Sequence, residues 1–288
     1  MPDKPYQYQP LHDVPHIIFL LGQMTLSGVY LIFFFITYLT FDEQLFNSRY
    51  ILFSQSVKIQ IFLGMILLLG STWMKKRFQF ILDPAQTENR NWAMNIFYVF
   101  LTLLLLALLL SIFRRSFHFL HLILFFLILV FLWIFARGYG FSLTRPAWNH
   151  PTSRGGIIQG ALTIGLGIAF FTFQESSLQE KMARWLLLLI LLRILTLWSR
   201  FRFLSKHSPY THSALKIILG SHIVLFSIRF IFSLIMPLVY VTWKMILSPT
   251  LPIQTAALMI LVGETSEAIL FFISSPPLSP ENNIPSNG

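Results

Sequence analysis

The sequence predicts an all-α, polytopic integral membrane protein whose helices form an eight-helix transmembrane bundle. Two observations lead to this fold class. Apolar residues make up 55% of the 288-residue chain and only 11% of residues are charged, so a water-soluble domain of this composition would lack a polar surface. The apolar residues also gather in blocks of about 20, the length that crosses a bilayer as a helix.

Eight apolar blocks follow one another along the chain, separated by short polar connections. They cover residues 16–40, 54–73, 93–112, 117–136, 156–173, 183–199, 217–243 and 251–273. No connection is long enough to separate a second domain, so residues 1–288 are expected to form a single membrane domain. The Pro-rich stretch 275–288 is typical of a disordered tail.

Local signals support individual blocks. Before the first block, Asp13 can cap the free backbone amides of a helix, and Pro15 suits its first turn. The fourth block is long and apolar enough to cross the bilayer. In the fifth block, Gly156 and Gly160 have the spacing that allows two membrane helices to approach closely.

The distribution of positive charge predicts an orientation. Eight spans place both termini on one face, and the connections on that face hold twelve Lys and Arg residues, including Arg200 and Arg202, against seven on the other. This majority favours cytoplasmic termini. The net charge of +10 is therefore expected to set topology and to contact anionic membrane lipid, and no nucleic acid partner is expected.

The chain contains no cysteine, which excludes disulfides, thiolate-bound iron–sulfur clusters and Cys-type zinc sites in this polypeptide. Electrons that cross it would travel on a bound organic molecule or on haem. A haem held by two histidines needs them on different helices at one depth. His118 and His121 begin the fourth span, whereas His222 lies near the opposite face. We therefore expect neither haem nor a metal site.

The connection between the fourth and fifth spans carries more chemistry than a turn requires. It holds Arg137, Tyr139, Trp148, Asn149 and His150. In one interpretation these groups orient the polar head of a lipid-soluble ligand at the membrane surface. In the other they form the ordinary interfacial belt of aromatic and basic residues.

Ionisable groups inside the spans need a reason, because each costs about 2.5–3.5 kcal/mol at the centre of a membrane helix. Four such groups are Arg193, His222, Arg229 and Glu264. Either Arg229 and Glu264 form an interhelical ion pair, or Glu264 accepts protons or contacts a ligand. Gln23 lies several turns into the first span and needs a partner, on a neighbouring helix or on a ligand.

Several different short motifs follow one another along nearly the whole chain. They are His12-Asp13-Val14-Pro15 with Gly22-Gln23; Arg114-Arg115; Arg137-x-Tyr139 with Pro146-Ala147-Trp148-Asn149; Arg200-Phe201-Arg202; Arg229-Phe230 with Pro237; and Gly263-Glu264 with Phe271-Phe272. In this order, and over eight spans, they resemble the membrane anchor subunit of dimethyl sulfoxide reductase and its relatives among molybdoenzyme anchors.

The resemblance implies that this chain is one subunit of a quinol-dependent oxidoreductase complex and that another subunit holds the catalytic centre. It would serve electron transport in anaerobic respiration, in the bacterial cytoplasmic (inner) membrane. It would oxidise menaquinol or ubiquinol and pass electrons to a four-cluster iron–sulfur subunit and on to a molybdopterin catalytic subunit that reduces an S- or N-oxide. The motif-bearing connections would face the iron–sulfur partner. The resemblance allows this partner to lie on either the cytoplasmic or the periplasmic side of the membrane.

We expect two groups of site residues on this basis. Asp13 and Glu264 would take part in proton transfer. The quinol contacts would be Gln23, Arg137, Tyr139, Trp148, Asn149, His150 and Arg229.

The chain departs from the family pattern at three places. The stretch 71–76 lacks a histidine usual after the second helix, Met94 and Asn95 stand near an expected glutamate, and Glu267 stands where arginine is usual. One alternative is thus a non-catalytic anchor whose quinol site has decayed. The other is a small-solute transporter, which the intramembrane charges permit, although the sequence shows no pair of Gly- or Pro-broken helices.

Overall fold

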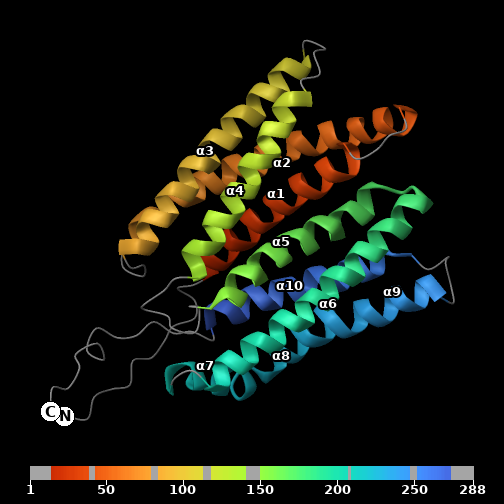
Figure 1. The fold of residues 1–288 in the computed structure, drawn as a ribbon. Coiled ribbons are helices and arrows are strands. Elements are labelled where there is room, and N and C mark those ends of the chain that lie inside the picture. Colours follow the sequence, from red (N-terminus) through yellow and green to blue (C-terminus); the bar gives the residue numbers. More distant parts are fainter. Residues whose placement is uncertain are drawn as a thin grey trace.

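The computed structural model describes residues 14–38, 43–78, 84–112, 118–140, 150–206, 209–246 and 252–273. Within these ranges the chain is helical apart from short turns and contains no strand, so the predicted all-α class is confirmed (Figure 1). The elements are α1 (Val14–Tyr38), α2 (Glu43–Phe78), α3 (Pro84–Ile112), α4 (His118–Gly140), α5 (Pro151–Thr172), α6 (Ser176–Lys206), α7 (Pro209–Leu219), α8 (Ile223–Phe230), the π-helical segment η3 (Ile231–Ile235), α9 (Met236–Ile246) and α10 (Gln254–Ile273).

Seven helical stretches of the described chain have the length and composition of membrane spans. They are Val14–Tyr38, Phe46–Leu67, His118–Gly138, Pro151–Thr172, Ser176–Lys206, Ile223–Ile246 and Gln254–Ile273. Helix α3 holds a shorter apolar stretch, Met94–Ala107. The chain is therefore built as a multi-pass membrane protein, while the eighth span stays a prediction.

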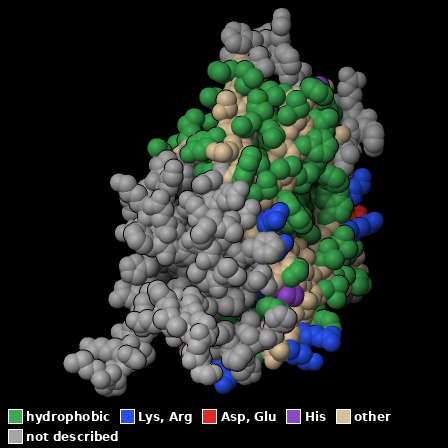
Figure 2. Space-filling view, turned by 60° about the vertical axis from the view of Figure 1, so that its left-hand side comes forward, with side chains coloured by type: hydrophobic (Ala, Val, Ile, Leu, Met, Phe, Trp, Pro, Cys, Tyr) green, Lys and Arg blue, Asp and Glu red, His purple; other side chains and the backbone are tan. Residues whose placement is uncertain are grey.

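The outer surface of the helices supports this conclusion. Large apolar side chains such as Leu69, Phe119 and Ile246 are each more than 70% exposed. On the face shown in Figure 2, apolar side chains cover the upper part, and Lys and Arg lie in the middle and lower parts. Such a surface is stable against lipid hydrocarbon and not against water.

The expected span 217–243 is wrong in where it starts. Helix α7 already ends at Leu219, a turn covers residues 220–222, and the apolar stretch begins at Ile223. Gly220 at this turn lowers the stability of a continuous helix, because glycine loses more backbone entropy than any other residue. The sequence pattern joined α7 and α8 because both are apolar.

The same span changes its hydrogen-bond pattern at η3. Pro237 has no N–H to donate to the carbonyl of Ser233. The backbone N–H of Met236 donates to the carbonyl of Ile231, five residues back. The widened turn rests closely on α10, since a Cβ added to Gly263 would lie 2.4 Å from the Cβ of Ser233.

The helices form two groups joined along α1 and α5. Helices α1–α4 pack together, α5–α10 pack together, and α1 and α5 lie side by side between them (Figure 1). Helix α1 also contacts α2, α4 and α10 and is buried along most of its length. A single apolar core extends through both groups.

Glycines set the distance between α1 and α5. A Cβ added to Gly28 would lie 1.8 Å from the carbonyl oxygen of Ala161, and one on Gly165 would lie 2.2 Å from the carbonyl oxygen of Gly28. Of the two glycines selected from the sequence, Gly160 does mediate close contact, because its Cβ would meet Met24 of α1. Gly156 does not, since nothing lies within 4 Å of its Cβ position.

A Gly28→Ala substitution tests this crossing. The added methyl group would collide with backbone that has no room to retreat, so we expect the free energy of unfolding to fall by about 3 kcal/mol or more. Thermal unfolding in detergent measures the change. Gly155→Ala in α5 is the matched control, because its Cβ position is open. Equal melting temperatures for the two variants would contradict the crossing.

Candidate functional site

A buried ion pair joins α6 to α10. Arg193 Nη2 donates to Glu264 Oε2 at 2.5 Å, and the two residues are only 3% and 1% exposed. Arg193 Nη1 also donates to the carbonyl of Gly156 in α5 at 2.8 Å, and Ser233 Oγ in η3 donates to Glu264 Oε1 at 3.4 Å. Four elements therefore meet at one carboxylate.

A second group of ion pairs lies one turn further along α10. Glu267 Oε1 accepts a hydrogen bond from Arg200 Nη1 at 3.0 Å, and Glu267 Oε2 pairs with Arg229 Nε in α8. The guanidinium carbon of Arg200 lies 5.6 Å from the ring centroid of Phe271. We call Arg193, Arg200, Arg229, Glu264 and Glu267 the arginine–glutamate cluster.

The predicted pairing of Arg229 with Glu264 is wrong. Arg193 pairs with Glu264, and Arg229 pairs with Glu267. Sequence reasoning also counted Arg200 as a loop cation, whereas it lies inside α6 and is 8% exposed. A signal was present, because Arg193 and Arg200 are seven residues apart on one side of α6, and Glu264 and Glu267 are one turn apart on α10.

The cluster holds three guanidinium groups and two carboxylates within the described residues. Beside it lies a void of about 10 Å³, lined by Arg200, Arg229 and Glu267 among others. That volume is close to the minimum needed for one water molecule. The arrangement can fix three helices and hold a water, and both carboxylates are already engaged by arginines.

Gln23 lies in the first half of α1, the helix that packs against both groups of helices. It is fully buried in α1, and neither its Oε1 nor its Nε2 has a hydrogen-bond partner in the described chain. Ser27, one turn along α1, is also fully buried with its Oγ unpartnered. Gln23 thus does not make the expected bond to a neighbouring helix, and the ligand contact stays a prediction.

Two predicted site residues, Arg137 and His150, lie at one end of the bundle, and His16 lies at the same end. His150 caps α5 by accepting from Thr152 N at 3.2 Å, and its ring lies 4.3 Å from that of Phe203 in α6. The rings of His16 and Phe272 lie 6.2 Å apart, which places the start of α1 beside the end of α10. Arg137 lies in the last turns of α4, and Arg154 lies in the first turn of α5.

Other predicted residues fall outside the described part of the chain. These are Asp13, Trp148, Asn149, the side chain of Tyr139 and the tail 275–288.

Three further histidines of the described chain contact tyrosines or lie in a turn. Tyr30 OH lies 3.2 Å from His121 Nδ1, and Tyr38 OH lies 3.2 Å from His118 Nδ1. His222 stands in the turn before α8, on the other group of helices. Among the residues that the structure describes, no three His, Asp or Glu side chains come together to hold a metal ion.

No family model matches this chain, and no curated protein matches it.

The ion pair can be tested by a double-mutant cycle. Arg193→Met and Glu264→Gln should each destabilise the protein by about 3–5 kcal/mol, because each leaves a buried group without its partner. The double variant should be more stable than the sum of the two effects implies. Unfolding in mixed detergent measures all three.

The matched control is the exposed pair Arg184–Glu180 on α6, whose side chains are 64% and 60% exposed. Glu180→Gln should change stability by less than about 1 kcal/mol. Additive effects of Arg193→Met and Glu264→Gln would show that the two residues do not interact.

Proposed function

We propose that this chain is the membrane anchor subunit of a reductase of the dimethyl sulfoxide reductase type and that it oxidises quinol in the bacterial inner membrane. The observation that supports the proposal best is the unpartnered amide of Gln23, buried in the central helix of the fold and part of the Gly-Gln motif. Leaving a buried amide unpaired costs free energy, which a bound ligand recovers. A quinol hydroxyl both donates and accepts, as the amide requires.

In this proposal the quinol head binds at Gln23, near the end of the bundle where His16, Arg137 and His150 gather. The hydroxyl donates to Gln23 Oε1 and accepts from Nε2. Oxidation of the quinol to quinone releases two electrons to the nearest iron–sulfur cluster of the partner and two protons to His16, His150 or Asp13. This chain contributes binding, orientation and proton exit, and the redox centres belong to the quinone and the partner.

The arginine–glutamate cluster then acts as a positioning element. Glu264 is engaged by Arg193 and Ser233, which favours the ion-pair interpretation over proton transfer. A Cβ added to Gly160 would lie 2.3 Å from Met24 Cε and 2.8 Å from Glu264 Oε2. The cluster therefore lies next to the turn of α1 that carries Gln23, and it fixes α10 and α5 against that turn.

A non-catalytic anchor is the weaker alternative. The family departure at the start of the third helix does not disturb the core, because Asn95 is exposed and Met94 is half-buried. An anchor that binds no quinol would also have no use for a buried amide without a partner. A leucine at position 23 would serve such a protein better.

A transporter is the second candidate, and one observation favours it. The span that contains α8, η3 and α9 changes to π-helical bonding at the residues that contact Glu264 and Gly263. Irregular helical turns beside intramembrane charges occur at ion and substrate sites. Uptake of a solute by vesicles that contain this chain alone would favour the transporter. Quinol oxidation that requires the partner subunits would favour the anchor.

A Gln23→Leu substitution tests the proposed function. It removes the ligand contact and replaces an unpaired polar group with an apolar one of similar size. We expect the rate of quinol-dependent S-oxide reduction by the tagged complex to fall at least about tenfold. A tenfold change corresponds to about 1.4 kcal/mol, the free energy of one hydrogen bond lost between protein and ligand. We expect thermal stability to stay the same or to rise.

Gln159→Leu is the matched control. Gln159 Oε1 lies 3.0 Å from Thr196 Oγ1, whose single proton it shares with the carbonyl of Arg193 at 2.9 Å, so this amide has a protein group within hydrogen-bond distance. Its loss should lower stability and leave the turnover of folded complex unchanged. A Gln23→Leu complex with full quinol-dependent activity would contradict the proposal.

A further inference from the structure

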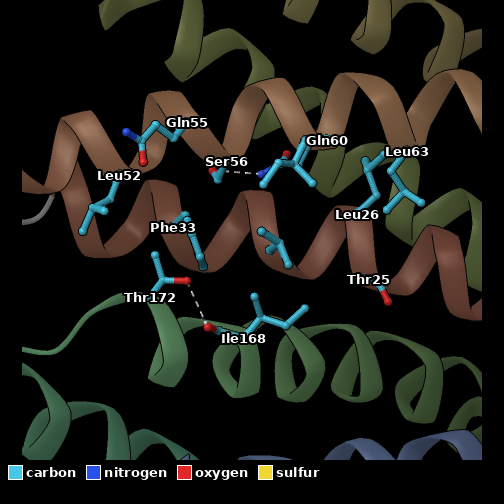
Figure 3. A pocket seen from close by; sticks show the side chains of 12 residues that line it. Thr25, Leu26, Phe33, Leu52, Gln55, Ser56, Gln60, Leu63, Ile168 and Thr172 are labelled. Atoms are coloured by element: carbon cyan, nitrogen blue, oxygen red, sulfur yellow. Dashed lines mark hydrogen bonds between the residues drawn. The ribbon is translucent and has the colours of Figure 1, made fainter.

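A groove lies on the other side of α1 from the arginine–glutamate cluster. It has a volume of about 220 Å³, with α1 as its floor and α2 and α5 as its walls (Figure 3). Helices α2 and α5 each pack on α1 without packing closely on each other. Val29 and Phe33 lie on the floor, Gln60 on the α2 wall and Ile168 on the α5 wall.

The wall formed by α2 presents a hydrogen-bond acceptor without a donor. Ser56 Oγ donates its only proton to the carbonyl of Phe53 at 2.7 Å, so it can only accept from the amide of Gln60, whose Nε2 lies 3.3 Å away. This orientation leaves Gln60 Oε1 without a partner, although Gln60 is only 3% exposed. Gln60 lines the groove, and Figure 3 shows its amide beside Ser56 on α2.

The surroundings restrict what can bind there. No side chain that lines the groove is charged, so the ligand is neutral. Ile59 at the rim is 69% exposed on a membrane-spanning stretch of α2, so the ligand enters from the lipid. Phospholipid headgroups lie outside the hydrocarbon layer, and an acyl chain offers no donor to Gln60.

The size of the groove suits one or two fused rings. A cavity of about 150 Å³ holds benzene in a well-studied engineered protein, and this groove is larger. The ligand is thus a neutral ring with a hydroxyl donor and an apolar tail that extends past Ile59 into lipid. A quinone offers only acceptors, whereas a quinol has the required donor.

We propose that this groove is a second quinol site, distinct from Gln23, in which a ring hydroxyl donates to Gln60 Oε1. The inference rests on the proposed function, which makes quinol the lipid-soluble substrate of this chain. The groove reaches Leu26 on α1, one turn from Gln23. A quinol held in it lies close to the proposed oxidation site.

Photolabelling of the full chain in lipid nanodiscs tests the proposal. The probe is a hydroquinone with a diazirine on the tail carbon next to the ring, so that the reactive group lies in the groove with the ring, and the labelled residues are located by mass spectrometry. We expect labels on residues 25–33 and 52–63. Unlabelled hydroquinone should displace the probe about five- to tenfold better than its dimethyl ether, which lacks the donor.

Two substitutions and one control substitution make the test more specific. Gln60→Leu should abolish the difference between hydroquinone and its dimethyl ether. Leu63→Trp should fill the groove and remove the labels, whereas Ile66→Trp, on the exposed side of the same helix, should leave them unchanged. Since both tryptophan variants lie on one helix turn, their melting temperatures show whether folding is preserved.

Three outcomes would overturn the groove as a quinol site. Labels in the groove that hydroquinone and its dimethyl ether displace equally would identify a groove filled by lipid. Labels only elsewhere, displaced by hydroquinone, would overturn the groove and leave the proposed function standing. No displaceable label anywhere on the chain would overturn both.

Discussion

The structure depends on the pairing of charges that are removed from water. An unpaired charge inside a bilayer is costly, so each buried carboxylate of α10 must meet an arginine, and each arginine must meet a carboxylate or a carbonyl. Arg193 binds Glu264 and the backbone of α5, while Glu267 binds arginines from α6 and α8. These contacts fix which faces of α5, α6, α8 and α10 turn inward.

Helix α1 connects this charged group of helices to the other half of the fold. Gly28 and Gly165 allow the backbones of α1 and α5 to touch, and Met24 fits against Gly160 beside Glu264. One side of α1 thus faces the cluster, and another faces the groove that ends at Gln60. Gln23 lies within this helix, and Gln60, whose Oε1 has no hydrogen-bond partner among the described residues, lines the groove beside it.

Hydropathy predicts the class of fold and most of the spans, because membrane helices need long apolar blocks. It does not detect the break at residues 220–222, since the helices on both sides are apolar. Nor does it choose between Arg193 and Arg229 as the partner of Glu264. That choice depends on how α6 and α8 are rotated about their axes, which packing decides. Hydropathy places Arg200 in a connection, because the apolar block ends before it. The helix itself continues past the block, as α6 does to Lys206.

The proposed function requires electron transfer from quinol to the iron–sulfur clusters of a partner subunit. Electron paramagnetic resonance of the anaerobically purified complex, recorded as quinol is added, measures this transfer most directly. We expect the chain to purify with an iron–sulfur subunit whose clusters become reduced by quinol alone. Clusters that dithionite reduces and quinol does not, or a chain that purifies without any iron–sulfur subunit, would contradict it.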